Sequence, residues 1–177
     1  VVAEIRAMGR KAVALGADLL DETETEGLIE RATGALGGPL TVLVNNASIF
    51  EYDTIQTATR DSWDRHIGSN LRAPFVLIQG FAAQAPRAKI IDGEPRAQAL
   101  VINMVDQRVL KPTPEFMTYS LAKAGLWALT RTAAQALAPD IRVNAIGPGP
   151  TMPGARQSEA EFKPQRAPTS LGSVSNP

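Results

Sequence analysis

A strand that ends on a carboxylate, followed by a tyrosine and a lysine one helical turn apart, constrains this chain more than any other feature. Residues 101–106 (VINMVD) form the β-branched apolar run of a buried strand, and Asp106 emerges at its carboxyl end. Tyr119 and Lys123 follow in a segment that opens a helix. A spacing of four residues places them on one helical face, about 40° apart at roughly 100° per residue. An acid, a phenol and an amine can therefore meet beyond the end of a strand, where open α/β sheets bind ligands.

Two readings of this constellation stay open from the residues alone. In the catalytic reading, the Lys123 ammonium stabilises the phenolate form of Tyr119 and lowers the pKa of its hydroxyl. In the other reading, Tyr119 and Lys123 are surface residues of an amphipathic helix, and Asp106 is a helix cap.

The composition excludes several classes of function. Eighteen basic and eighteen acidic residues leave no net charge to attract nucleic acid or anionic lipid. The absence of cysteine excludes disulfides and thiolate metal sites, and the presence of a single histidine, His66, argues against a histidine-based metal site. We interpret His66 as a surface or packing residue. No apolar run approaches the length of a membrane span and no signal peptide is visible, so we expect a cytoplasmic protein.

The rest of the chain predicts alternating helices and strands. Helices are predicted for residues 1–8, 21–36, 61–78 and 119–137, and strands for residues 12–15, 40–44, 101–106 and 141–146. Asp21 and Asp61 are the predicted caps, and Pro74 is expected to kink its helix. Five residues at three- and four-residue steps are predicted to form a core face on that helix: Trp63, Ile67, Leu71, Phe75 and Ile78. The glycines between 34 and 38 precede a strand, so we read them as a helix stop. That strand, at 40–44, is almost entirely apolar, so we expect it to be buried on both faces. Residues 86–98 are charged and turn-rich, which predicts an exposed loop.

Three further motifs accompany the strand and helix of the first paragraph. Asn45-Asn46-Ala47-Ser48 follows the 40–44 strand, Asn70 lies within a helix, and residues 144–149 (NAIGPG) follow another strand. With Asp106, Tyr119 and Lys123, these resemble the short-chain dehydrogenase/reductase family in order and spacing, over nearly the whole chain. The resemblance implies an α/β fold, a doubly wound, Rossmann-like parallel sheet, in a single domain over residues 1–177. It also implies that residues 152–177 form a flap over the substrate.

The resemblance further implies which residues act. The catalytic residues would be Asp106, Tyr119, Lys123 and Asn70. The cofactor contacts would be Asp18, Leu19, Asn45, Ala47, Ser48, Tyr119, Lys123, Pro148, Gly149 and Thr151. The substrate contacts would be Ser48, Phe50, Asp106 and Tyr119, with no metal. From the residues alone, Asp18 reads equally well as a polar turn residue. Residues 45–48 remain open to the alternative of an ordinary Asx turn, and Asn70 to that of a satisfied core amide, although the family role is favoured for Asn70.

The chain departs from the family pattern at both ends. The family begins with a strand and a TGxxxGxG-type loop that binds the cofactor pyrophosphate, and it ends with a further helix and strand. Neither occurs in these 177 residues. We therefore expect a sheet that is incomplete at both ends, and impaired activity for a molecule made of these residues alone.

Asp106 is a departure of another kind. Most family members carry a serine thirteen residues before the tyrosine, where its hydroxyl donates to a substrate carbonyl. An ionised carboxylate only accepts hydrogen bonds, so it suits a partner with N–H groups or an imine nitrogen that needs a proton. Together with residues 46–50 (NASIF), 68–74 (GSNLRAP) and 103–106 (NMVD), it resembles the pteridine reductases within the family.

The leading hypothesis is an NADPH-dependent reductase of a pterin-like C=N bond, with NADH not excluded. Tyr119 and Asp106 would deliver protons, Lys123 would hold the cofactor ribose, and Phe50 would stack on the heterocycle. One alternative is a reductase of the same fold that acts on a carbonyl or alcohol. Another is a non-catalytic fragment that only packs against a partner subunit, which would bind no NADPH. By family resemblance we expect a homo-oligomer, a dimer or tetramer, in which the Asn70 and Tyr119 helices pair.

Overall fold

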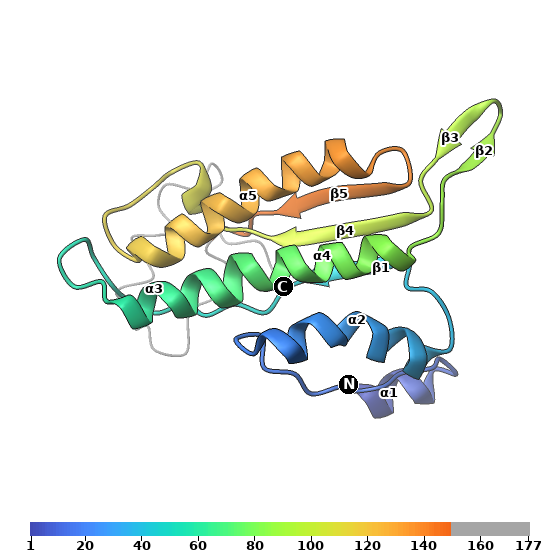
Figure 1. Ribbon diagram of the computed structural model, residues 1–177, viewed down its shortest axis with the longest axis horizontal. Coiled ribbons are helices and arrows are strands. Elements are labelled where there is room, and N and C mark those ends of the chain that lie inside the picture. The colour runs from blue at the N-terminus through green and yellow to red at the C-terminus, as the bar shows by residue number, and fades with distance from the viewer. Residues whose placement is uncertain (150–177) are drawn as a thin grey trace.

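The structure is a computed structural model that describes residues 1–149 (Figure 1). Its helices are α1 (Val2–Ala7), α2 (Glu22–Leu36), α3 (Arg60–Ile67), the π-helix η1 (Gly68–Arg72), α4 (Ala73–Gln84), the 3₁₀ turn η2 (Gln107–Val109) and α5 (Met117–Leu137). Its strands are β1 (Val42–Asn45), β2 (Lys89–Ile91), β3 (Glu94–Arg96), β4 (Ala99–Met104) and β5 (Ile141–Ile146). Thr151 and the predicted flap at 152–177 lie outside the described residues.

Three strands form a parallel sheet in the order β1-β4-β5. In the register of the sheet, Asn45 lies opposite Asn103, and Asn103 lies opposite Ala145. The carboxyl ends of all three strands therefore reach the same edge, because parallel strands connected by crossover helices all run in one direction. The predicted α/β architecture with a parallel sheet is confirmed.

The core lies between one face of this sheet and helices α2, α4 and α5, which run alongside the strands (Figure 1). It is made by Ile29, Leu77, Ile78, Phe81, Ala99, Val101, Ala133, Ile141 and Val143. We expected β1 to be buried on both faces, and this was wrong for the described residues. Val42 and Val44 are 54% and 51% exposed, because alternate side chains of a strand point to opposite faces and no described helix covers theirs.

The predicted long helix is interrupted before Pro74. The α3 cap is Thr59, which forms a capping box with Ser62, so the predicted Asp61 cap was wrong. The π-helix η1 lies directly before Pro74, and the Ala73 N–H ends it by donating to the Gly68 carbonyl. Proline itself has no amide proton to donate, so the regular helical hydrogen bonding is interrupted here.

The buried face of this helix also differs from the prediction. Trp63 and Phe75 are 44% and 46% exposed, whereas His66 and Asn70 are fully buried. Ile78 is buried in the core as predicted, whereas the buried side of the N-terminal part of this helix is held by polar side chains that the apolar pattern did not indicate.

Two smaller elements also differ from the sequence predictions. Residues 12–15 form no strand, and Val13 and Leu15 are partly exposed. The described part of the chain offers them no partner strand, and an unpaired strand is not stable. Conversely, the predicted exposed loop at 86–98 contains the hairpin β2–β3, with Asp92 and Gly93 at positive φ in its turn. The Asp-Gly pair was a signal for this turn.

The Asp21 cap is confirmed: its side chain accepts a hydrogen bond from the Glu24 amide. Gly37 ends α2 in the left-handed conformation, as the helix-stop reading requires. Within residues 1–149, none of the helices has the length and apolar character needed to cross a bilayer.

Candidate active site

Tyr119, Lys123 and Asp106 come together at the carboxyl end of β4, as the sequence indicated. The Tyr119 hydroxyl donates to Oδ2 of Asp106 over 3.0 Å. The Lys123 ammonium lies 5.7 Å from the centre of the Tyr119 ring and donates to the Met104 carbonyl oxygen over 2.7 Å. Tyr119 and Lys123 are both buried, at 6% and 3% exposed. A buried phenol and a buried amine beside a partly buried acid at a strand end can carry out proton transfer.

Asp106 fills the capping role that the sequence left open, and its carboxylate also binds the Tyr119 hydroxyl. Its side chain caps the 3₁₀ turn η2 by accepting a hydrogen bond from the Arg108 amide over 2.8 Å. The Arg108 guanidinium lies 3.4 Å from each carboxylate oxygen. Asp106 is therefore held in place from two sides and presents Oδ2 to Tyr119.

The pKa of Tyr119 is raised, which corrects the expectation that Lys123 would lower it. Burial contributes most, followed by the negative charge of Asp106 and the hydrogen bond to it, while Arg108 opposes the shift. Burial also lowers the pKa of Lys123, against the effect of Asp106. The expectation failed first because the phenol is buried, and second because the nearest polar partner of its oxygen is a carboxylate, where the family has a neutral serine. At neutral pH Tyr119 is a neutral hydrogen-bond donor.

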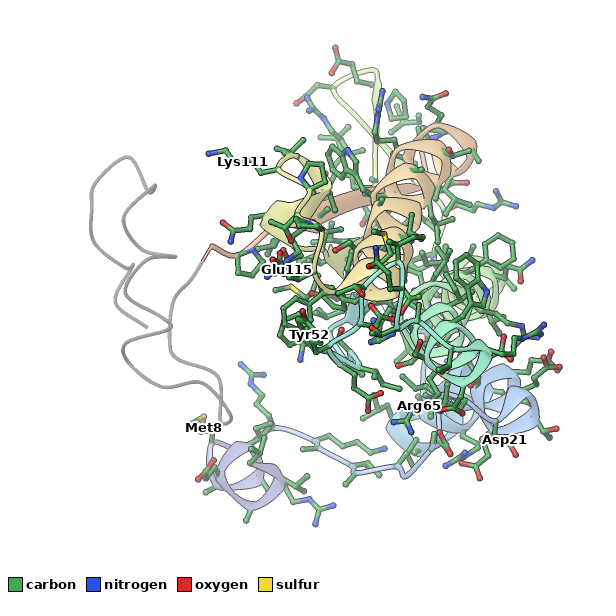
Figure 2. The ribbon with its side chains drawn as sticks, turned by 90° about the vertical axis from the view of Figure 1, so that its left-hand side faces the viewer. Met8, Asp21, Tyr52, Arg65, Lys111 and Glu115 are labelled. Atoms are coloured by element: carbon green, nitrogen blue, oxygen red, sulfur yellow. The ribbon has the colours of Figure 1, made fainter. Side chains whose placement is uncertain are left out.

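Aromatic rings form a wall beside this group. Phe50 stacks on Phe116, with ring centres 4.2 Å apart and planes within 10°, and meets Tyr119 edge-on at 4.7 Å. The Arg108 guanidinium lies 5.6 Å and 5.0 Å from the two phenylalanine ring centres. The ring of Tyr52 meets that of Phe116 edge-on, with 5.3 Å between the ring centres. Tyr52 lies on the same side of the molecule as Lys111 and Glu115 (Figure 2). Phe50 remains half exposed, so part of its ring is open to a ligand.

Asn70 is a satisfied core amide. Its side chain accepts from the Ile49 amide over 2.9 Å and donates to the Ile49 carbonyl over 2.8 Å. The π-helix η1 carries it, and π-turns are frequent at functional sites. Its effect is to hold the segment that leads to Phe50. Ser48, on the same segment, is exposed and donates weakly to the Ile49 carbonyl over 3.3 Å.

His66 is fully buried, so the surface reading was wrong and the packing reading was right. Its Nδ1 lies 2.7 Å from the Thr118 hydroxyl, and its Nε2 accepts from the Glu51 amide over 3.2 Å. The Thr118 hydroxyl in turn donates to Asp53, which is also buried. Sequence reasoning missed Asp53 and Thr118. His66 and Asn70 are four residues apart and so lie on one helical face, and this spacing indicates a shared role for these two side chains.

The carboxyl group of Asp53 is ionised in spite of its burial. Burial acts to raise its pKa, but hydrogen bonds from the Thr118 hydroxyl and amide and from Ser62 hold that pKa below its ordinary value. Phe116, the residue directly before α5, supplies no side-chain cap. Asp53 caps this helix from outside by accepting the Thr118 amide over 3.1 Å.

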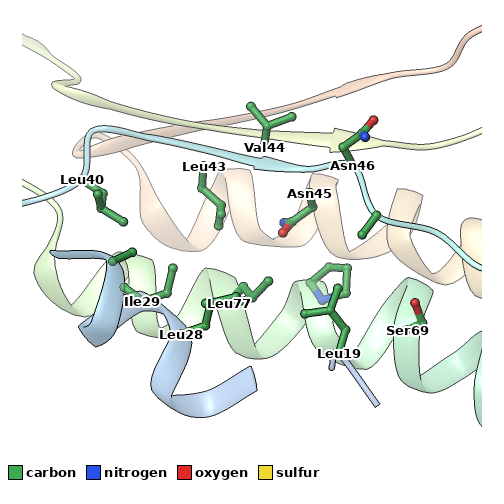
Figure 3. A pocket seen from close by; sticks show the side chains of 13 residues that line it. Leu19, Leu28, Ile29, Leu40, Leu43, Val44, Asn45, Asn46, Ser69 and Leu77 are labelled. Atoms are coloured by element: carbon green, nitrogen blue, oxygen red, sulfur yellow. The ribbon is translucent and has the colours of Figure 1, made fainter. Parts of the chain in front are cut away.

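The residues that the resemblance assigns to a nucleotide lie only partly together. Leu19, Asn45 and Ala47 line a cavity of about 310 Å³ between α2, β1 and α4 (Figure 3). Asn45 donates to Asn103, and its own amide oxygen is buried with no hydrogen-bond partner in the described part of the chain. Asp18 lies outside this lining and fixes a turn by accepting from the Leu20 amide. Pro148 and Gly149 follow β5 and are exposed.

Comparison with known proteins gives one family. The family described as short chain dehydrogenase matches residues 1–164. The uncharacterized oxidoreductase YjdA of Bacillus subtilis is 34% identical over 149 residues, which are 84% of this chain and 57% of the relative. The 3-oxoacyl-[acyl-carrier-protein] reductase FabG of Staphylococcus aureus is 33% identical over 150 residues, 84% of this chain and 57% of the relative.

Solved structures agree with these matches. FolM alternative dihydrofolate reductase 1 from Brucella suis, in complex with NADP, is 39% identical with a TM-score of 0.85, over 98% of this chain and 66% of its own. A blue fluorescent protein from a metagenomic library, in complex with NADPH, is 30% identical with a TM-score of 0.86, over 99% of this chain and 68% of its own. The predicted Rossmann-like fold class is thus confirmed. The chain spans little more than half the length of the curated relatives named above.

Proposed function

This chain belongs to the short-chain dehydrogenase family, and we propose that it works as an NADPH-dependent reductase of a pterin-like C=N bond. The observation that carries the proposal is the 3.0 Å hydrogen bond from Tyr119 to Asp106 beside the half-exposed ring of Phe50. A carboxylate, a phenol and an aromatic face match the three features of a pterin: N–H groups, a C=N bond and a flat ring.

The chemistry of the acid favours a nitrogen heterocycle over a ketone. Asp106 can accept hydrogen bonds from ring N–H or amino groups, which a simple ketone lacks. Because the pKa of Tyr119 is raised, its hydroxyl holds its proton until reduction of the C=N bond makes the substrate nitrogen strongly basic. The nitrogen then takes this proton, and a proton from solvent returns to the phenolate by way of Asp106, to which Tyr119 is hydrogen-bonded.

The residues present fit a nicotinamide nucleotide, which would supply the hydride when bound. Lys123 has one hydrogen bond among the described residues, to Met104, so two N–H groups of its ammonium can meet ribose hydroxyls. The apolar cavity at Leu19 and Ala47 suits a flat ring. NADPH is the preferred cofactor because the FolM and blue fluorescent protein structures hold NADP and NADPH.

A second candidate is a reductase of the same family that acts on a carbonyl. It is favoured by the relative FabG, whose name describes a reductase of 3-oxoacyl thioesters. Rates of NADPH oxidation by the intact protein distinguish the two candidate functions. One group of substrates is dihydropterins and dihydrofolate, and the other is simple ketones and a 3-oxoacyl thioester. The pterin proposal expects turnover of the first group and little of the second. The reverse order would establish the carbonyl reductase.

The proposal includes a cytoplasmic homo-oligomer, a dimer or tetramer built on α3, α4 and α5. Trp63, Phe75 and Leu121 are each almost half exposed on these helices, and such apolar surface favours an interface. Light scattering on the intact protein should give at least a dimer. A monomer at high concentration would contradict this part of the proposal.

A further inference from the structure

Three polar residues at four-residue spacing on one helix bind alternate residues of the segment 49–53. Ser62 donates to the Asp53 carboxylate over 3.1 Å, His66 accepts from the Glu51 amide, and Asn70 binds both backbone groups of Ile49. The residues between them, Phe50 and Tyr52, contact the aromatic wall instead. The face of α3 and η1 therefore determines where the ring of Phe50 lies.

The same network reaches the helix that carries Tyr119. Thr118, the residue before Tyr119, bonds to Asp53 through both its amide and its hydroxyl, and this hydroxyl also meets His66. His66 is thus the one side chain of the network that contacts the Phe50 segment and the Tyr119 helix at once. Its ring lies edge-on to the Tyr119 ring at 6.1 Å between centres and has no exposed surface.

The hydrogen-bond directions fix the form of the imidazole. Because Nε2 accepts from the Glu51 amide, a neutral ring must carry its proton on Nδ1. Nδ1–H then donates to the Thr118 hydroxyl, which in turn donates a hydrogen bond to the Asp53 carboxylate. No other side chain offers an acceptor and a donor at these two positions on one rigid ring.

We propose that His66 is a positioning residue that fixes the spacing between Phe50 and Tyr119. The proposal rests on the proposed function, since Phe50 and Tyr119 are its substrate-contacting residues. Productive geometry is demanding, and a displacement of about 1 Å can cost roughly a hundredfold in rate. His66 has no exposed surface with which to contact a substrate, and it does not line the cavity at Leu19 and Ala47. Its loss should therefore affect the substrate and spare the cofactor.

Four variants of the intact protein separate its two contacts. His66→Phe keeps the ring volume and removes both hydrogen bonds. His66→Gln keeps an acceptor near the position of Nε2, and His66→Asn keeps a donor near the position of Nδ1. Phe81→Leu is the matched control, because Phe81 is fully buried in the core and lies outside the network.

The expected result is a loss of kcat/KM for the pterin-like substrate without a change in cofactor binding. His66→Phe should lower kcat/KM at least about tenfold, at a temperature where the variant is folded, and leave the Kd for NADPH within about twofold. His66→Gln and His66→Asn should each recover part of the loss. Phe81→Leu should lower Tm and leave kcat/KM unchanged. Full activity in folded His66→Phe would overturn the proposal and leave His66 a packing residue.

A second measurement does not depend on turnover. His66 is the single histidine of this chain, and the His66→Gln variant assigns its signals in ¹⁵N-histidine NMR of the intact protein. The expected result is a proton on Nδ1, together with slow hydrogen exchange of the Glu51 amide that is lost in His66→Phe. A proton on Nε2, or rapid exchange in the wild type, would overturn the positioning role. Absence of turnover on every substrate would instead refute the proposed function, and the NMR result would then decide the positioning role alone.

Discussion

The hydroxyl of Tyr119 donates to Asp106 over 3.0 Å, so a carboxylate rather than the ammonium of Lys123 is its polar partner. Lys123 donates to the Met104 carbonyl and meets Tyr119 only through the ring face. Burial and this pair together raise the pKa of Tyr119. In the proposed function, Asp106 governs the proton of Tyr119 and Lys123 binds the cofactor.

The first prediction concerns this separation. Lys123→Met in the intact protein should weaken NADPH binding about tenfold or more, because a charged hydrogen bond is worth about 1.5–3 kcal/mol. Stability should change little, because burial already disfavours the charged ammonium in the folded protein. Isothermal titration with NADPH and thermal unfolding measure the two effects. An unchanged Kd would show that Lys123 does not contact the cofactor.

The second prediction concerns the aromatic wall. Phe50→Leu should raise KM for a dihydropterin roughly three- to tenfold, since an aromatic contact adds about 0.5–1.5 kcal/mol beyond its area. Tm should fall only slightly because the ring is half exposed. Steady-state kinetics test this, with Tyr52→Leu as the control for a more exposed ring of the same wall. An equal rise in KM for both variants would argue against stacking on Phe50.

The third prediction is a pH dependence of stability. The pKa of Asp53 is lowered in the folded protein from its ordinary value of 3.8, so the unfolded chain binds more protons in that range. The stability that Asp53 contributes is therefore fully present above the ordinary value and is lost as the pH falls through the folded value. Urea unfolding should show that the stability difference between wild type and Asp53→Asn is constant above about pH 5 and shrinks below about pH 4. A difference that grows on acidification would contradict the assignment.

Much of the fold followed from local pattern. The parallel strands at 40–44, 101–106 and 141–146 and the helix at 119–137 were predictable because their apolar periodicity reports burial directly. Residues 12–15 were not, because a strand is defined by its partner and not by its own sequence. The buried face of the 61–78 helix was also missed, because His66 and Asn70 are buried by hydrogen bonds to backbone groups and not by hydrophobicity.

The site shows the same division. Spacing was enough to bring Asp106, Tyr119 and Lys123 together, since one strand end and one helical face determine it. The direction of the Tyr119 pKa shift was not predictable, because it depends on how deeply the phenol is buried and on which charged group lies nearest its oxygen. Asp53 and Thr118 left no local signal, since their pairing joins residues 65 positions apart.

The proposed recognition of a pterin by Asp106 is tested most directly by Asp106→Ser in the intact protein, measured as the ratio of kcat/KM for a dihydropterin to that for a simple ketone. This ratio should fall ten- to about a hundredfold, because the variant loses a charge-assisted contact worth about 1.5–3 kcal/mol with the pterin. Serine still caps η2, and the pKa of Tyr119 should fall once the carboxylate is gone, so ketone reduction should hold or improve. An unchanged ratio would contradict the reading of Asp106 as the residue that recognises a pterin and would leave a carbonyl reductase as the better description.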